Sequence, residues 1–404
     1  MNYKKNNLYI ENVQLQKIAK KFGTPSYCYS LNKIKSNIIN FKKNFKSINP
    51  LLCFSVKSNS NLQILKEVKK MGMGADVVSK GELMISLRAG ISPKKIVFSG
   101  VGKNIDELHF AINKNILLIN SESESEIKLI EKIAKIKNKK INIGIRLNPN
   151  IDPKTLKNIS TGKKEDKFGV TENNFLKILK KFKNSKHLSI KCLSVHIGSQ
   201  ITNYKPYERM LGVIKSVIKK SKHSFDFIDL GGGIGIKYNN NTKKFDYNKY
   251  SSILKKFLNT YRTKIIFEPG RSIIGDTALL LTKILYIKKT NKINFIILDA
   301  AMNDFMRPAL YNANHKIIAF KKNKKIINKK HEFVGPICET TDRFLSIAKF
   351  HKLNENDNLA ICDVGAYGMV LSSNYNLRTK PAEILINKSS FKLITKRQKL
   401  FSII

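Results

Sequence analysis

Reactive side chains stand directly after several short apolar runs of the sequence. One of them, Lys57, ends the apolar part of CFSVKSNSN (53–61). A lysine amine held at the buried end of a strand has a lowered pKa, and the unprotonated amine can form a Schiff base. In a chain this rich in lysine, Lys57 can equally be an ordinary solvated residue, and the segment alone does not decide between the two.

A run of three glycines follows another apolar stretch, in FIDLGGGIGIKY (227–238). Backbone without side chains can approach a phosphate closely and offer its N–H groups to the anion. The GGGIG spacing does not fit the dinucleotide-binding pattern with its acidic residue about 20 positions on. The same glycines can also form a tight turn between a strand and a helix, without any ligand.

Arginine is scarce, so each arginine in a polar motif is informative. Only nine of the 75 basic residues are arginine. Glu268 and Arg271 flank a rigid Pro-Gly turn in IIFEPGRSI (265–273), and Arg307 lies in DAAMNDFMRPALY (299–311). An arginine in place of the usual lysine indicates bidentate binding of a carboxylate or a phosphate.

Three further segments carry candidate residues. His196 follows an apolar run in SVHIGSQI (194–201), although a single histidine is often structural. Cys338 precedes Glu339 in GPICETTD (335–342); an intracellular cysteine is usually inert and buried, but one beside an acid in a turn can act as an acid or a nucleophile. Tyr367 lies in GAYGMVLSSNYN (365–376), whose composition is typical of a binding loop.

These motifs stand where strands of an alternating β/α pattern would end. We expect strands at 26–29, 52–56, 75–78, 95–98, 117–119, 141–147, 190–196, 227–230 and 265–268. Helical patterns lie between them at 62–71, 80–89, 125–137, 174–182, 207–222 and 250–261. About eight β/α units in one run favour a (β/α)8 barrel of the TIM type, whose active site lies at the carboxyl ends of the strands.

The pattern changes near residue 280. Strand-like segments with few helices follow, at 284–289, 295–298, 316–320, 326–334, 358–362 and 382–386. We therefore expect an α/β chain of two domains: a barrel at 26–280 and a mainly β domain, sandwich- or barrel-like, at 281–404, which the N-terminal segment 1–25 joins.

The net charge of +46 would usually indicate a nucleic-acid or anionic-membrane partner. Lysine, asparagine and isoleucine are all abundant, which is typical of A/T-rich coding, and the lysines are scattered along the chain. We therefore interpret the charge as a compositional background and expect no nucleic-acid partner. The sequence has no apolar run of about 18 residues for a membrane span and no apolar signal segment near its start. Five widely spaced cysteines fit neither a disulfide framework nor a zinc ribbon, so we expect a cytoplasmic protein without a metal.

Taken in order along the chain, these motifs resemble one family, diaminopimelate decarboxylase, of the alanine-racemase-like (fold-type III) group of pyridoxal-phosphate enzymes. The resemblance runs from about Leu8 to Leu385. It includes GTPSYCYS, FSVKSN, GADVVSKGEL, FSGVGK, RLNPNIDPKTLKNISTGKKEDKFGV, HIGSQI, DLGGGIGIKY, EPGRS, DAAMNDFMRPALY, GPICETTD and GAYGMVLSSNYNLRTKPAE.

The resemblance implies a pyridoxal-phosphate barrel and a β domain whose first strand comes from the N-terminus. It implies that Lys57 holds the cofactor, that His196 stacks on its ring and that Glu268 keeps its pyridine nitrogen protonated, so that the ring accepts electrons. Cys338 matches the position of the proton donor. The other cofactor positions match Asp76, Ser199, Gly233, Pro269, Gly270, Arg271 and Tyr367, and the substrate positions match Arg271, Arg307, Tyr311, Glu339 and Tyr367.

The implied reaction is decarboxylation of meso-2,6-diaminopimelate to L-lysine and CO2, the last step of lysine biosynthesis. Two arginines and a glutamate suit the far end of this substrate, which carries a carboxylate and an ammonium group. The resemblance also implies a homodimer with shared active sites, to which the GPICETTD loop contributes. The alternatives are a decarboxylase of another basic amino acid or of carboxynorspermidine on the same fold, or a pyridoxal-phosphate-binding homologue without catalysis.

Overall fold

The computed structural model describes residues 1–153, 155, 159–238 and 242–404. The chain forms two compact units, which we describe separately. The barrel domain comprises Ile38–Lys237 and Thr242–Ser272; the β domain comprises Met1–Asn37, Ile273–Ile404 and a short stretch that begins at Tyr238. Within the long predicted motif at 146–170, residues 154 and 156–158 lie outside the described residues.

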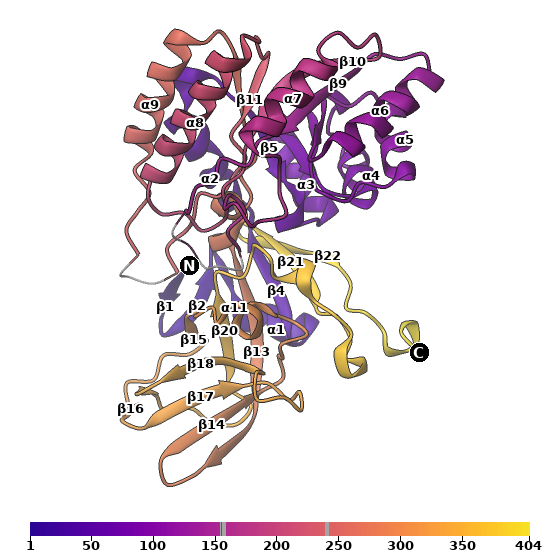
Figure 1. The fold of residues 1–404 in the computed structure, drawn as a ribbon. Helices are drawn as coiled ribbons and strands as arrows, with labels where there is room; N and C mark the ends of the chain where they lie inside the picture. The colour runs from indigo at the N-terminus through magenta and orange to yellow at the C-terminus, as the bar shows by residue number, and fades with distance from the viewer. Residues whose placement is uncertain (154, 156–158, 239–241) are drawn as a thin grey trace. The chain divides into compact units, whose positions relative to one another are not determined.

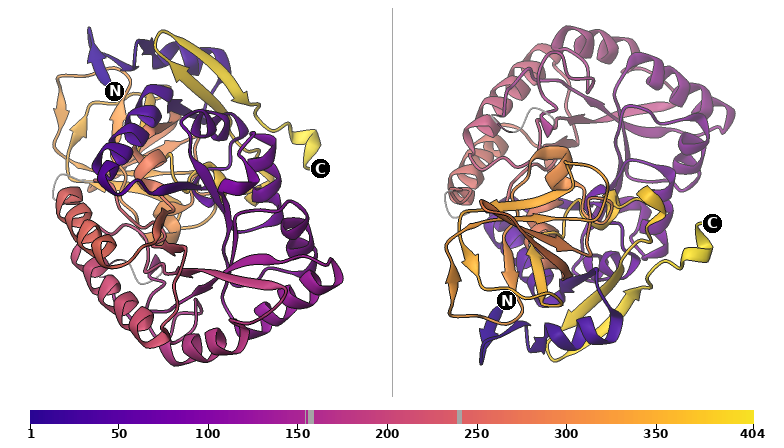
Figure 2. Two further views of the ribbon diagram at one scale, coloured as in Figure 1. Left: turned by 90° about the horizontal axis from the view of Figure 1, so that it is seen from above. Right: turned by 90° about the horizontal axis from the view of Figure 1, so that it is seen from below.

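The barrel domain is built on a closed barrel of eight parallel strands. It closes where the last strand pairs with the first, through Ile266 and Leu51. The helices lie outside the strands and surround them (Figures 1 and 2). In chain order the strands are β5 (Leu51–Ser55), β6 (Gly74–Val77), β7 (Ile96–Phe98), β8 (Leu118–Ser121), β9 (Ile141–Arg146), β10 (Leu188–Ser194), β11 (Phe227–Asp229) and β12 (Lys264–Phe267).

Polar N-cap residues begin several of the surrounding helices. Asn104 and Glu107 form a capping box, in which each side chain accepts a hydrogen bond from the other residue's backbone N–H. Ser79 and Ser123 cap the helices on either side of this one. The helices are α2 (Leu31–Asn44), α3 (Leu62–Lys70), α4 (Lys80–Arg88), α5 (Ile105–Asn113), α6 (Glu124–Ile136), α7 (Glu172–Phe182), α8 (Lys205–Ser221), α9 (Tyr247–Thr260) and the short α10 (Arg271–Ile274).

The β domain is organised around a nine-stranded sheet in which β4 is central. β4 pairs antiparallel with β13 and parallel with β21. Leu8, Ile18 and Ile384 are among the residues of its apolar core. Its elements are β1 (Asn2–Lys4), β2 (Asn7–Ile10), β3 (Val13–Gln14), α1 (Leu15–Phe22), β4 (Ser26–Ser30), β13 (Ala278–Lys289), β14 (Ile293–Leu298), α11 (Arg307–Tyr311), β15 (Ile317–Ala319), β16 (Ile326–Ile327), β17 (Lys330–Val334), β18 (Arg343–Ile347), β19 (Phe350–His351), β20 (Asn358–Cys362), β21 (Ala382–Asn387) and β22 (Ser390–Thr395).

The predicted fold class is confirmed, with one correction to the strand assignment. The expected strand at 26–29 exists as β4, but it pairs with β13 and β21 and not with a barrel strand. All five residues of β4 are buried, so its pattern is that of any fully buried strand and does not identify its sheet. The compact units also divide the chain at Asn37 and Ser272, whereas we expected the barrel to extend from 26 to 280.

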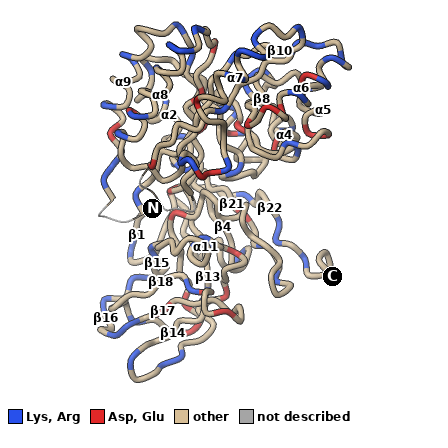
Figure 3. Tube along the Cα trace, viewed as in Figure 1, with Lys and Arg blue, Asp and Glu red and all other residues tan. Residues whose placement is uncertain are grey.

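Lysine and arginine residues are distributed along the chain in both domains (Figure 3). Among the described residues, no helix is both long enough and apolar enough to span a bilayer. The same residues contain no group of three or more histidine, cysteine or acidic side chains that could hold a metal ion.

Candidate active site

A lysine and a buried aspartate meet at the carboxyl ends of two neighbouring barrel strands. Lys57 follows β5, and its Nζ lies 3.0 Å from Oδ2 of Asp76 on β6. The hydroxyl of Ser55 donates to the same oxygen at 2.8 Å. Asp76 is fully buried, and its Oδ1 has no hydrogen-bond partner among the described residues. The buried carboxylate of Asp76 therefore holds the Lys57 amine at the mouth of the barrel through one oxygen, and its other oxygen can accept a further hydrogen bond.

His196 lies two residues beyond β10 and is held as a neutral ring. Its Nδ1 accepts a hydrogen bond from the backbone N–H of Gly232 at 3.2 Å, which leaves the ring proton on Nε2. Burial, followed by the positive charges of Lys57 and Arg146, lowers the pKa of His196 well below its usual range. A neutral, oriented imidazole suits stacking on a flat ring.

The three glycines after β11 are required by close packing. A Cβ on Gly231 would lie 2.4 Å from Nδ1 of His196, and one on Gly232 would lie 2.2 Å from the carbonyl oxygen of Glu268. Gly231 and Gly233 also have positive φ angles, of 62° and 95°. The backbone here thus runs against the neighbouring strand ends, at a position where no other residue type fits.

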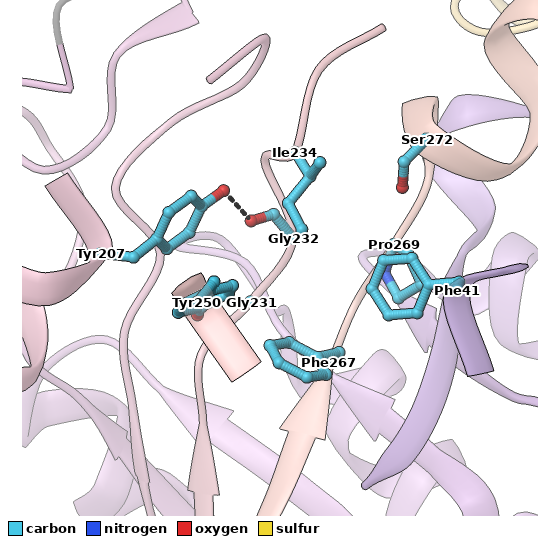
Figure 4. Close-up of a pocket in the computed structure, with 9 residues that line it drawn as sticks. All are labelled: Phe41, Tyr207, Gly231, Gly232, Ile234, Tyr250, Phe267, Pro269 and Ser272. Atoms are coloured by element: carbon cyan, nitrogen blue, oxygen red, sulfur yellow. Dashed lines mark hydrogen bonds between the residues drawn. The ribbon is translucent and has the colours of Figure 1, made fainter. Parts of the chain in front are cut away.

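A narrow apolar cavity lies beside this glycine turn, and Gly231 and Gly232 form part of its lining (Figure 4). Its empty volume is about 210 Å³, and it is too narrow for a water molecule. The hydroxyl of Tyr207 donates to the carbonyl oxygen of Gly232 at 2.9 Å. The lining residues are Phe41, Tyr207, Gly231, Gly232, Ile234, Tyr250, Phe267, Pro269 and Ser272.

Glu268 follows β12 and belongs to a buried acidic network. The pKa of Glu268 is raised well above its usual range by burial and then by the negative charges of Asp229 and Asp76. Burial likewise raises the pKa of Asp229. Asn120 donates to Asp229 Oδ2 at 2.8 Å and to Ser99 Oγ at 3.2 Å, and that hydroxyl lies 3.5 Å from Glu268 Oε1. The network can therefore hold a proton between two carboxyl groups in the barrel.

The EPGRS segment also contacts the lysine segment and the histidine segment. A Cβ on Gly270 would lie 3.0 Å from the side chain of Ser58, beside Lys57. The carbonyl oxygen of Pro269 accepts from the backbone N–H of Ser55 at 3.2 Å. Arg271 donates to Ser199 Oγ through Nε at 3.3 Å and through Nη2 at 3.1 Å.

A buried ion pair close to the backbone of His196 was not predicted from the sequence. Arg146, the last residue of β9, donates to Glu122 at 2.7 Å, and both side chains are almost fully buried. The other Glu122 oxygen accepts from the backbone N–H of Gly169 at 2.7 Å, and Arg146 Nη2 reaches the carbonyl oxygen of His196 at 3.4 Å. The scarcity of arginine could have identified Arg146, just as it identified Arg271.

The remaining predicted residues belong to the β domain. Arg307 and Tyr311 are the first and last residues of α11. Cys338 is exposed, whereas Cys28, Cys53, Cys192 and Cys362 are buried. Burial raises the pKa of each of these four thiols. Cys338 is therefore the cysteine that can meet a ligand.

Glu339 and Tyr367 lie on two loops of the same domain. Glu339 accepts hydrogen bonds from the hydroxyls of Thr341, at 3.0 Å, and of Tyr375, and these bonds lower the pKa of the Glu339 carboxyl. Tyr367 has a positive φ of 55°, a conformation that few residues other than glycine adopt. The barrel residues are thus brought together, and the roles of the five β-domain residues stay predictions.

The chain is similar over its whole length to proteins of one family. The family model described as "Pyridoxal-dependent decarboxylase, pyridoxal binding domain" matches residues 31–275. Diaminopimelate decarboxylase of Aquifex aeolicus is 40% identical, with 98% of this chain and 95% of the relative covered. The chain belongs to the diaminopimelate decarboxylase family. Its cofactor is pyridoxal 5′-phosphate.

Solved structures of the family agree with this assignment. The Helicobacter pylori enzyme, solved in complex with L-lysine, gives a TM-score of 0.91 at 40% identity, with 96% of this chain and 98% of that chain covered. The M. jannaschii enzyme, also solved with L-lysine, gives a TM-score of 0.94 at 33% identity, with 100% of this chain and 96% of that chain covered. Both the barrel and the β domain are therefore those of the family.

The residues at the barrel mouth fit pyridoxal phosphate. Lys57 offers an amine beside a buried carboxylate, and Asp76 retains an oxygen without a partner among the described residues. The glycines at 231–233 expose backbone that a side chain would cover. Glu268 lies in a network that can carry a proton. The aldehyde, the phosphate and the ring nitrogen of the cofactor thus each have a matching group, in Lys57, the glycine backbone and Glu268 respectively.

Proposed function

We propose that this protein decarboxylates meso-diaminopimelate to L-lysine and CO2 with pyridoxal phosphate as cofactor. The observation that carries the proposal is the similarity to diaminopimelate decarboxylases across both domains, with 40% identity over 98% of the chain. It therefore covers the barrel with Lys57 and also the β domain with Cys338 and Arg307.

The barrel residues would bind the cofactor and set its protonation. Bound pyridoxal phosphate withdraws electrons from the carbon that loses CO2. Lys57 would hold it through Nζ, and the neutral ring of His196 would stack on it. Glu268 would hold a proton at the ring nitrogen, a role supported by its place in a buried network of hydrogen-bonding side chains. The phosphate would lie against the backbone of Gly233, with Ser199 and Arg271 as polar partners. Further cofactor contacts are proposed for Asp76, Pro269, Gly270 and Tyr367.

The β-domain residues would bind the substrate and return a proton. Cys338 would donate the proton to the carbon that has lost CO2, which requires an accessible thiol, and this thiol is exposed. Glu339 would face the distal ammonium group, and its lowered pKa keeps it ionised. Arg307 would bind the distal carboxylate. Arg271, Tyr311 and Tyr367 would complete the substrate site.

We also propose that the protein works as a homodimer in the cytoplasm. The family resemblance supports an active site to which a second copy contributes its Cys338 loop. Sedimentation of the holoenzyme should give a dimer, and a mixture of Lys57→Ala and Cys338→Ala chains should recover part of the activity that each variant lacks alone. Failure of this complementation would argue against shared sites.

The direct test is release of CO2 by the purified protein with pyridoxal phosphate. We expect release from meso-diaminopimelate and little from ornithine, arginine or carboxynorspermidine; turnover of one of the others in its place would overturn the proposal. Lys57→Ala should lose the absorbance band of the bound cofactor. Cys338→Ala should keep that band and lose most of the turnover, and normal turnover would exclude Cys338 as the proton donor.

A further inference from the structure

Arg307 of the β domain is oriented by two side chains that meet one of its nitrogens. Its Nη1 donates to the hydroxyl of Tyr238 at 2.7 Å and to Nε2 of His315 at 3.0 Å. The guanidinium lies over the ring of Tyr238, 4.7 Å from the ring centre. Because Nη1 carries two hydrogens, these two bonds fix both the position of this nitrogen and the plane of the guanidinium.

The hydrogen bonds of His315 determine its protonation state. Arginine has no acceptor, so Nε2 of His315 must accept from Arg307. The other ring nitrogen, Nδ1, lies 2.8 Å from the carbonyl oxygen of Cys362, which can only accept, so Nδ1 must carry the proton. Both contacts require the same neutral form of the imidazole. Protonation of Nε2 would set one N–H against another and one positive charge against another.

His315 is itself rigidly held. It is 1% exposed, and its ring packs edge-on against Phe305, at 4.7 Å, and Tyr238, at 5.0 Å. The carbonyl that it binds belongs to β20, which pairs with β13 and β15. A fixed part of the sheet is thereby connected through one imidazole to the guanidinium of Arg307.

Both acceptors on Nη1 are neutral, and this matters for the charge of Arg307. A carboxylate at position 315 would hold the arginine equally well, but it would also neutralise the guanidinium. A neutral histidine and a phenol orient the guanidinium without themselves neutralising it. Such orientation by neutral groups suits an arginine that binds a carboxylate.

We propose that His315 is a positioning residue that orients Arg307 toward the distal carboxylate of the substrate. It thereby favours substrates that carry this second carboxylate. The inference rests on the proposed function, in which Arg307 binds that group. Because meso-diaminopimelate has one D and one L centre and the product is L-lysine, the reacting centre is the D centre, and the distal carboxylate is on the L centre.

Two substitutions at His315 separate the bond to Arg307 from the bond to Cys362. His315→Gln can place an amide oxygen near the position of Nε2 and so keep an acceptor for Arg307. His315→Asn can place an amide N–H near the position of Nδ1 and keep the bond to the carbonyl of Cys362, but it does not reach Arg307. A matched control is His331→Asn, since His331 is also buried in the β domain and its Nδ1 also lies close to a backbone carbonyl, at 2.6 Å.

The experiment compares KM and kcat for meso-diaminopimelate with the inhibition constant of D-lysine, which keeps the D centre and lacks the distal carboxylate. For His315→Asn we expect KM to rise by about 10-fold to 100-fold, the range for loss of one hydrogen bond to a charged group. We expect kcat to change by less than about 3-fold, because the lost contact is equal in ground and transition states. His315→Gln should restore most of the affinity, and the inhibition constant of D-lysine should stay constant in all variants.

The outcomes distinguish this inference from the proposed function. If the wild-type protein does not turn over diaminopimelate, the proposed function is wrong and the inference falls with it. If the wild type is active and His315→Asn has a normal KM, only the inference is overturned. Two other results would show general damage to the domain and would also overturn the inference. One is that His315→Asn weakens the binding of D-lysine as much as that of diaminopimelate; the other is that His315→Gln and His331→Asn raise KM as much as His315→Asn does.

Discussion

Replacing Glu122 by glutamine tests whether the buried ion pair with Arg146 supports the cofactor face of the barrel. One carboxylate oxygen of Glu122 accepts from Arg146 and the other from the N–H of Gly169, each at 2.7 Å. Glutamine has the same shape but only one acceptor oxygen. Its NH2 group must therefore face a donor, either the guanidinium or the backbone N–H.

The expected loss is large because the arginine would stay buried without its carboxylate. The two side chains are 8% and 3% exposed, and removing one partner of such a pair costs about 3–5 kcal/mol. For a domain of this size, each kcal/mol lowers the melting temperature by about 2–4 °C, so we expect a fall of about 6–20 °C. Since Arg146 also reaches the carbonyl oxygen of His196, the affinity for pyridoxal phosphate should fall as well.

Thermal unfolding of the apoprotein, with a titration of pyridoxal phosphate followed by absorbance, measures both effects. The matched control is Glu124→Gln, two residues further along the chain at the start of α6, where Glu124 contacts Lys128 and Lys181 at the surface and no measurable loss is expected. The double variant Glu122→Leu/Arg146→Met should regain stability relative to Glu122→Gln, because it leaves no buried charge from this pair. Equal melting temperatures for Glu122→Gln and Glu124→Gln would refute the reasoning.

Two further predictions concern the acid pair and the glycine turn. Because the folded pKa of Glu268 lies above its unfolded value, its contribution to stability is full below pH of about 4.3 and is lost as the pH rises through the folded pKa. Asp229→Asn removes one cause of the raised pKa of Glu268. The melting temperature of the wild-type apoprotein should therefore fall more between pH 5 and pH 8 than that of the Asp229→Asn apoprotein. Parallel plots of melting temperature against pH would contradict this. Gly231→Ala, which places a Cβ 2.4 Å from His196 Nδ1, should weaken pyridoxal phosphate binding about tenfold or more in an absorbance titration. Gly212→Ala, in an open position of α8, should leave binding unchanged; equal affinities in the two alanine variants would show that the turn tolerates a side chain.

The repeating barrel was predictable because each unit combines an apolar strand with an amphipathic helix. The strand predicted at 26–29 exists, but its assignment to the barrel was wrong, because the sequence of a fully buried strand does not indicate which sheet it joins. The helices α2 and α5 were not predicted. In α2, LNKIKSNIINFKKN, the buried residues Leu31, Ile34, Ile38 and Phe41 follow helical spacing, so this helix was also visible in the sequence. Helix α5 depends on a capping box that was visible in the sequence as Asn104 and Glu107.

The barrel half of the candidate site was predictable where a residue type is rare or a motif is unusual. Lys57, the glycine run and the EPGR turn all lie at strand ends, as expected from the pattern. The acidic network was not predictable, because its members are distant in sequence and only barrel closure brings them together. Asn120 and Asp229, for example, are 109 residues apart in the sequence, but Nδ2 of Asn120 lies 2.8 Å from Oδ2 of Asp229. No local pattern marks such a pair.

The central position of β4 has a consequence for the synthesis of the protein. Ser26–Ser30 leaves the ribosome early, but its partner β13 begins about 250 residues later, and its other partner, β21, only at Ala382. At roughly 5–20 residues per second, the strand waits for about 12–50 seconds before the first partner is made. Throughout this time a strand that is fully buried in the folded protein is without its neighbours, which favours aggregation. The nascent chain therefore has a period of vulnerability that lasts while the entire barrel is translated.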